Sequence, residues 1–247
     1  MTLTAFRLVT IPILSDLEVR EAPGTRLAEK SRDFRLLALK ISSNAFASTY
    51  EEESKRSIEQ TYERLTNSKA VQFVALKRGD EAIEQGASVV GLDELVRNEW
   101  EGFIVLLGPQ AGSDGGVSAS VNPFHLMTKT SAGDDAEDKS GGSHQDQTAL
   151  HFHLNGMFVR PAARGSGLGR MLIEAAIERA VATAQGSDTK EIVVTIIVDE
   201  WNTKARSLYE RCAFVGVARD TYRQQGQELA ELRVALRMEL RRTLDEK

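Results

Sequence analysis

VRPAARGSGLGRML, residues 159–172, lies where one predicted strand ends and a helix begins. Its three glycines, at positions 165, 167 and 169, leave a stretch of backbone without side chains. Glycine permits positive φ and lacks the Cβ that would hold a ligand away, so successive N–H groups can converge on an anion at the positive end of the helix dipole. The glycines alone fit two interpretations, a phosphate-binding turn and a flexible strand-to-helix turn without a ligand.

The spacing of the glycines separates this turn from two other phosphate loops. A dinucleotide fingerprint needs G-x-G-x-x-G, and here the third glycine comes one residue early. A nucleotide P-loop needs Gly-Lys followed by Ser or Thr, which is absent from the segment. The spacing therefore disfavours an NAD-dependent enzyme.

The elements around the turn alternate between strand and helix. We predict a strand at 150–159, a helix at 167–185, a strand at 191–198 and a helix at 202–211. This order favours a parallel strand pair joined by a crossover helix.

The flanking regions predict antiparallel ribbons on both sides of that pair. Before it we expect strands at 5–14, 71–76 and 100–107, a helix at 33–47, and a second helix that Ser48 or Thr49 caps and that runs to about residue 65. After it we expect strands at 215–223 and 231–240. The predicted fold class is mixed α/β, in one domain over residues 1–247.

Residues 110–149 interrupt this pattern. The segment 128–149 has no large apolar side chain and carries five carboxylates and two lysines. Such a composition cannot offset its ordering entropy by burial. We predict a flexible insertion within the single domain.

Composition limits the classes of partner. The chain of 247 residues has a formal charge of −5. A protein that binds nucleic acid or an anionic membrane surface is expected to be positively charged, so neither is predicted as a partner. It has one cysteine, Cys212, so no internal disulfide forms, which suits a reducing compartment. Because we find neither an export signal nor about 18 consecutive apolar residues, we expect a cytoplasmic protein, with the nucleus as an alternative.

Two motifs resemble the GNAT superfamily of N-acetyltransferases. V-x-P-x-x-R-G-x-G-x-G, from Val159 to Gly169, is similar to the loop that binds the acyl-CoA pyrophosphate. Downstream, N-x-x-A-x-x-x-Y matches Asn202, Ala205 and Tyr209, with Ala213 in place of the usual glycine before Phe214. The resemblance covers residues 150–240 and implies the GNAT fold: a mostly antiparallel, twisted sheet with a central, splayed parallel pair.

The resemblance implies acetyl-CoA as the acyl donor. No metal is predicted, because no third ligand accompanies His151 and His153 at a recognisable spacing. The resemblance further implies that the backbone of the strand at 150–159 binds the pantetheine arm of the coenzyme and that the glycine-rich loop binds its phosphates. It also makes the side chain of Asn202 a coenzyme contact. The implied residues are Met157, Phe158, Val159, Arg164, Gly165, Ser166, Gly167, Leu168, Gly169, Arg170 and Asn202. For the arginines, exposed helix-end positions are the alternative, and Arg170 is four residues from Glu174, an ordinary surface pair. Gly156 is either part of the splay or a simple bulge.

Aminolysis of a thioester needs an uncharged amine, a stabilised oxyanion and a proton for the leaving thiolate. By resemblance Tyr209 is the general acid, although a tyrosine at helical spacing also fits a core position. Strand alternation puts His151, His153, Asn155, Met157 and Val159 on one face. By the resemblance, His153 lies where some family members place a catalytic glutamate, and imidazole titrates near neutral pH, so His153 is the predicted general base. A proton relayed by water through Asn155 or backbone groups is the alternative.

The resemblance implies that the acceptor pocket comes from the first two helices, where Phe46 and Tyr50 lie. Glu51, Glu52 and Glu53 lie beside them, and we interpret these carboxylates as helix-start charges and caps. The predicted reaction is direct acetyl transfer to a primary amine, on a small molecule or a protein, in a ternary complex, by a monomer or homodimer. A non-catalytic acyl-CoA-binding module of the same fold is the alternative.

Overall fold

The computed structural model describes residues 6–77, 91–110, 149–185, 187–224 and 231–244. The predicted insertion at 110–149 lies outside the described residues, except for its first and last positions. In the part of the chain that is described, no helix is long and apolar enough to cross a membrane.

Seven strands form one mixed sheet in the order β1-β2-β3-β4-β5-β7-β6. The strands are β1 (Phe6–Ile11), β2 (Ala70–Lys77), β3 (Trp100–Gln110), β4 (Ala149–Val159), β5 (Glu191–Asp199), β6 (Val215–Tyr222) and β7 (Arg233–Thr243). β4 and β5 pair in parallel, and the five other neighbouring pairs are antiparallel. This confirms the mixed α/β class and the central parallel pair.

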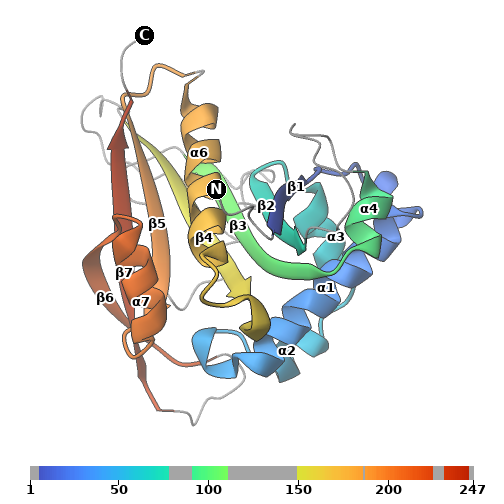
Figure 1. The fold of residues 1–247 in the computed structure, drawn as a ribbon, viewed down its shortest axis with the longest axis horizontal. Helices are drawn as coiled ribbons and strands as arrows, with labels where there is room; N and C mark the ends of the chain where they lie inside the picture. Colours follow the sequence, from blue (N-terminus) through green and yellow to red (C-terminus); the bar gives the residue numbers. More distant parts are fainter. Residues whose placement is uncertain (1–5, 78–90, 111–148, 186, 225–230, 245–247) are drawn as a thin grey trace, which may run out of the picture.

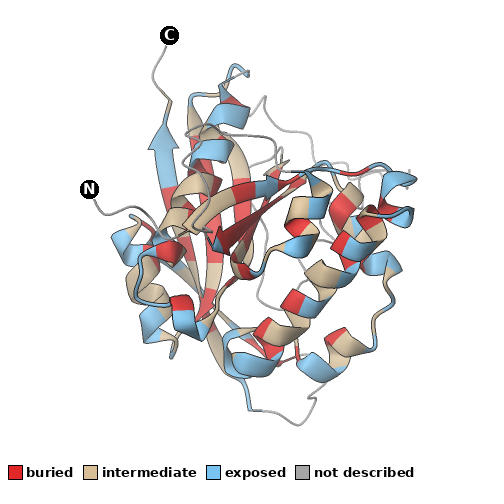
Figure 2. Cartoon of the chain, turned by 45° about the vertical axis from the view of Figure 1, so that its right-hand side comes forward, coloured by how far each residue is buried: buried red, intermediate tan, exposed pale blue. Residues whose placement is uncertain are grey.

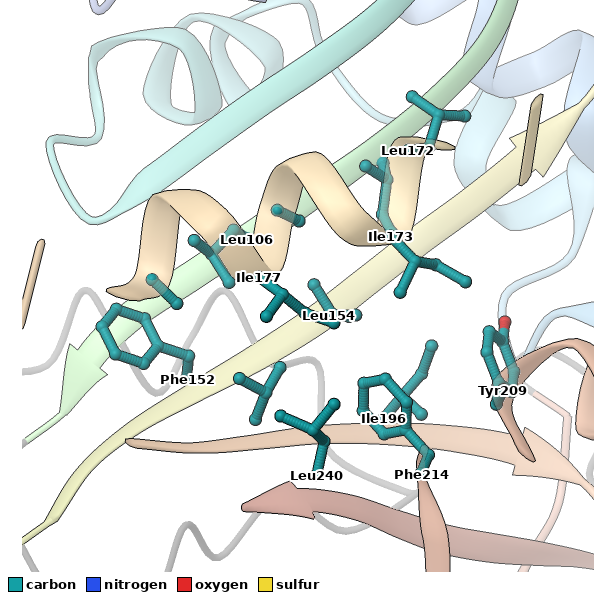
Figure 3. Close-up of a cluster of buried hydrophobic side chains, with 14 of the residues drawn as sticks. Leu106, Phe152, Leu154, Leu172, Ile173, Ile177, Ile196, Tyr209, Phe214 and Leu240 are labelled. Carbon is teal, nitrogen blue, oxygen red and sulfur yellow. The ribbon is translucent and has the colours of Figure 1, made fainter. Parts of the chain in front are cut away.

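The helices cover the two faces of the sheet separately (Figure 1). They are α1 (Gly24–Ile41), α2 (Tyr50–Ser54), α3 (Glu59–Thr66), α4 (Leu92–Arg97), α6 (Leu168–Ala184) and α7 (Thr203–Arg211). α6 crosses one face and packs on Leu106, Leu154 and Ile196 (Figure 3). α1, α3 and α4 pack on the other face through a second cluster that includes Phe34, Trp100 and Phe158.

The two clusters follow from strand alternation. In β2, Phe73 and Ala75 join the α6 cluster, whereas Val74 and Leu76 join the α1 cluster. Since successive side chains point to opposite faces, one apolar strand supplies both layers. Burial is accordingly concentrated along the sheet and the inner sides of the helices (Figure 2).

The N-terminal helices differ from the sequence prediction. α1 begins at Gly24, not at residue 33, because Leu27 and Ala28 extend its buried face upstream. It ends at Ile41, and a 3-10 turn, η2 (Ser43–Ala45), follows in place of further helix. The predicted second helix is divided into α2 and α3, and α4 was not predicted.

Candidate active site

The parallel pair opens at its carboxyl end. Pairing runs from Ala149 opposite Glu191 to Leu154 opposite Ile196, whereas β4 continues to Val159 and β5 to Asp199. Beyond Leu154, β4 stays paired with β3 on its other edge, as far as Val159 opposite Gly102. One edge of the last β4 residues therefore faces a gap in the sheet, which confirms the predicted splay.

A β-bulge lies where the strands separate. Val105 is opposite Asn155 but Phe103 is opposite Phe158, so β4 has one extra residue, and Gly156 there has φ +64°. Past the bulge Met157 packs against the α6 cluster, the face that Leu154 also uses. The expectation that His153 and Asn155 share a face with Met157 and Val159 was therefore wrong, because the extra residue reverses the alternation.

The glycine-rich turn has open space over its backbone. Gly165 and Gly167 have φ +79° and +86°, and a Cβ built on either would meet no heavy atom within 4 Å. Gly167 caps α6, and the amide of Met171 makes the bond to its carbonyl at 3.1 Å. The N–H groups of the helix's first turn precede that bond and have no helical acceptor. The turn can therefore hold an anion such as a phosphate.

Gly169, Arg164 and Ser166 support the structure of the turn through contacts with neighbouring residues. A Cβ on Gly169 would lie 3.0 Å from both Leu208 and Met157, so this glycine lets α6 approach α7 and β4 closely. Arg164 donates to the Val159 carbonyl at 3.0 Å and to Ser42 Oγ at 3.1 Å. Ser166 Oγ donates to the Ala163 carbonyl at 2.7 Å.

Three further predicted coenzyme residues have protein contacts of their own. Arg170 Nε lies 2.7 Å from Glu174 Oε1, the surface pair that the sequence left as an alternative. Asn202 Oδ1 accepts from the Ala205 amide at 3.3 Å and so caps α7. The Phe158 ring is buried against Phe34, so only its backbone can face a ligand.

Tyr209 stands between the core and a cavity. Its ring is 7 % exposed and packs edge-on against Phe214 at 6.2 Å, and Figure 3 shows it at the border of the α6 cluster. Its hydroxyl donates to Met157 Sδ at 3.7 Å, beside the bulge. Burial raises the pKa of this phenol well above its usual value, so the proton stays on the oxygen at neutral pH.

His153 is buried and hydrogen-bonded on one side. Thr195 Oγ1 donates to the Phe152 carbonyl at 3.1 Å, so at 2.9 Å it accepts from His153 Nδ1–H. Nε2 is therefore the unprotonated nitrogen. Burial lowers the pKa of His153 to about 4. The expectation that this imidazole titrates near neutral pH was wrong, because the sequence did not reveal its burial.

These groups line one cavity of about 180 Å³. It is bounded by β4 at His153, Asn155 and Met157, and by Tyr209 from α7. Of the two predicted acceptor residues, Phe46 lines the cavity. Tyr50, at the start of α2, is 38 % exposed and is not among the described residues that line it.

Glu53, and not Tyr50, brings α2 to the cavity wall. The helix-start interpretation fits Glu52, whose amide donates to the Thr49 cap and whose side chain pairs with Lys55. It was wrong for Glu53, which is 4 % exposed and lines the cavity. A bond from Arg64 Nη1 at 2.9 Å holds it there. Burial by itself would raise the pKa of Glu53, but the surrounding arginines lower it.

Asp199 is a cavity residue that sequence reasoning missed. It ends β5, and both its carboxylate oxygens accept from the Tyr222 hydroxyl at 2.9 Å, with Arg233 as its ion-pair partner. Burial raises the pKa of Asp199 in spite of these partners. An acidic residue directly after an apolar strand was the available signal.

Comparisons with known proteins agree with this geometry. Residues 135–214 match the model of the acetyltransferase (GNAT) family. Arabidopsis thaliana NAA60 in complex with a bisubstrate analogue superposes with a TM-score of 0.50 at 15 % identity, covering 97 % of this chain and 100 % of its own. A putative acetyltransferase (ACIAD1637) from Acinetobacter baylyi ADP1 gives 0.50 at 16 % identity, covering 99 % and 95 %.

A search of curated proteins finds no match. At these identities the solved structures establish the fold, and the family model covers the turn, the bulge and the α7 motif. Residues 135–214 therefore match the GNAT acetyltransferase family, and the fold around them is one that solved acetyltransferases share, which supports an enzyme of the acyltransferase class.

Proposed function

We propose that the protein transfers the acetyl group of acetyl-CoA to a primary amine, by direct attack within a ternary complex. The observation that carries the proposal is that β4 leads from the cavity at Tyr209, along its free edge, to the open glycine turn that follows it in the sequence. The turn would hold the pyrophosphate, and the pantetheine arm would add to β4 as a further strand.

Each chemical requirement has a candidate group beside the bulge. A backbone N–H near Met157 would polarise the thioester carbonyl, and one such donor is worth about 3 kcal/mol in acyl transfer. When the amine nitrogen bonds to the carbonyl carbon and the C–S bond breaks, the thiolate would take the Tyr209 proton. His153 is too weak a base to hold the amine's proton at neutral pH, so its Nε2 would orient the amine while a water relay past Asn155 removes the proton.

The test measures coenzyme binding and amine-dependent thiol release separately. Acetyl-CoA at about 100 times its Kd should add about 2.7 kcal/mol to the stability of the fold, and NAD should add nothing. Thiol release should then require an added amine. Binding without thiol release across an amine panel would instead make the protein an acyl-CoA-binding module.

Tyr209→Phe tests the general acid. The ring contact with Phe214 stays, but the leaving thiolate loses its proton donor, so turnover should fall about 100-fold or more while the Kd for acetyl-CoA stays unchanged. The measurement is kcat from thiol release together with Kd from calorimetry. A fully active variant would remove Tyr209 from the mechanism.

A further inference from the structure

Three guanidinium groups share one carboxylate in the wall of the cavity that α1, α2 and α3 build. Arg64 Nη1 lies 2.9 Å from Glu53 Oε1, and Arg56 Nη1 lies 3.2 Å from Glu53 Oε2. Arg35, from α1, is the third guanidinium that acts on the same carboxylate. All four residues line the cavity, and three positive charges there face one negative charge.

Arg35 is the member of this cluster whose charge is least compensated. Its guanidinium lies over the Phe46 ring, 4.7 Å from the centroid. Its Nη1 is buried, and no described residue accepts a hydrogen bond from it. Burial lowers the pKa of Arg35 to about 10. A buried cation with an unused donor is costly for the fold and favours a bound anion.

The remaining charges of the described cavity wall do not balance this excess. Arg32 adds a fourth cation, which donates to the carbonyls of Ser54 and Arg56. Asp199 is the second carboxylate, and it already has Arg233 and the Tyr222 hydroxyl as partners. The wall is therefore locally positive in a chain whose formal charge is −5.

We infer that the acceptor is an amine that also carries a carboxylate, and that this carboxylate binds Arg35. The planar fork of arginine matches the two oxygens of a carboxylate, and the chain between carboxylate and amine would lie along Phe46. The amine would then point to the other side of the cavity, where Asn155 and Tyr209 meet the acyl group. A polycationic acceptor would meet repulsion in the same wall.

This inference rests on the proposed function, and its test separates the two. The substrates are ω-amino acids, H₂N–(CH₂)n–COO⁻, each compared with its primary amide, so that charge is the main difference within a pair. Peptides with an acidic residue or its amide at the second position form a parallel series, which distinguishes a small acceptor from a protein N-terminus. We expect kcat/KM to favour the acid by about 10- to 100-fold in one of the two series, as one charge-assisted hydrogen bond would give.

Variants of Arg35 assign the preference to this residue. Arg35→Gln should lower the acid-to-amide ratio of kcat/KM to about 1, and Arg35→Lys should restore part of that ratio. Because Arg35→Gln removes a buried donor without an acceptor and leaves Arg56 and Arg64 to pair with Glu53, the variant should fold with a Tm close to that of the wild-type protein. Arg26→Gln is the matched control, since it makes the same charge change on α1 at an exposed pair with Asp93.

Each outcome decides one of the two proposals. Equal rates for acids and amides in the wild-type protein, or an acid preference that survives in Arg35→Gln, would overturn the inference and leave acetyl transfer intact. Acetyl-CoA binding with no turnover of any amine would overturn the proposed function and the inference with it.

Discussion

His153 links stability to pH through a single buried side chain. Its pKa is about 4 in the fold and about 6.5 in an unfolded chain, so below pH 6.5 the unfolded chain binds the proton more readily. The free energy of unfolding therefore keeps its full value above pH 6.5 and decreases as the pH falls toward 4, because the unfolded chain gains a proton that the folded chain does not bind. The total effect of this one group is about 3 kcal/mol.

His153→Asn should remove that pH dependence. The asparagine Nδ2 can replace Nδ1 as the donor to Thr195 Oγ1, but it does not titrate. Urea unfolding at pH 7, 5.5 and 4 should show a flatter loss of stability than in the wild-type protein. His151→Asn, at a half-buried neighbouring position, should keep the wild-type slope. The same slope in both variants would contradict the assignment.

At the scale of single elements, α7 ends in a Schellman motif with an unusual residue. The Phe214 amide donates to the Tyr209 carbonyl and the Ala213 amide to the Glu210 carbonyl, both at 3.0 Å. Ala213 has φ +67°, the conformation that glycine adopts at this position. The left-handed turn therefore forms in spite of the replacement, and the Tyr209 ring packs against Phe214 across it.

Ala213→Gly should stabilise the protein. Relief of the left-handed alanine gains about 1–2 kcal/mol, and the extra chain entropy of glycine costs about 0.5–1 kcal/mol. The net gain of about 0.5–1 kcal/mol should raise Tm by about 1–4 °C in calorimetry. Ala205→Gly, inside the same helix, is the control and should lower stability by about 1 kcal/mol. A similar loss of stability in Ala213→Gly would show that the left-handed backbone of Ala213 is not strained.

The cap of α6 gives a test of coenzyme binding. Gly167→Asn keeps a residue type that tolerates positive φ, and its side chain would enter the space where the phosphate is expected. Acetyl-CoA affinity by calorimetry should fall about tenfold or more, with a stability change below about 1 kcal/mol. Gly91→Asn, at the open and exposed cap of α4, is the matched control and should bind as the wild-type protein does. Unchanged affinity in Gly167→Asn would count against the loop.

Elements with a strong local pattern could be predicted from the sequence. The order from β4 to α7 follows from alternating apolar runs and two motifs, and the structure confirms it. The bulge at Gly156 could not be predicted, because strand periodicity assumes no extra residue, and that error placed Met157 on the wrong face. The burial of Glu53 depends on Arg64, from another helix, a contact that no local spacing encodes.

At the scale of the whole molecule, segments far apart in the sequence meet beside the cavity. The segment between α1 and α2, residues 42–46, is bound by residues far along the chain. Gln224 Nε2 donates to the carbonyls of Ser43 at 2.9 Å and Phe46 at 3.0 Å, and Arg233 donates to the Asn44 carbonyl. Arg164 of the glycine turn binds Ser42. The glycine-rich turn, the cavity wall at Phe46 and the C-terminal strand β7 are thus all tied to residues 42–46.

Gln224→Ala should loosen that segment without changing the glycine-rich turn. Two carbonyls lose a donor whose own side chain is buried, so unfolding should become easier by about 1–2 kcal/mol in urea titration. KM for the acceptor should rise because Phe46 lines the cavity, while the Kd for acetyl-CoA should not change. Gln185→Ala, at the exposed end of α6, should alter neither quantity. If Gln224→Ala weakened acetyl-CoA and left KM unchanged, the segment would support the turn and not the acceptor wall.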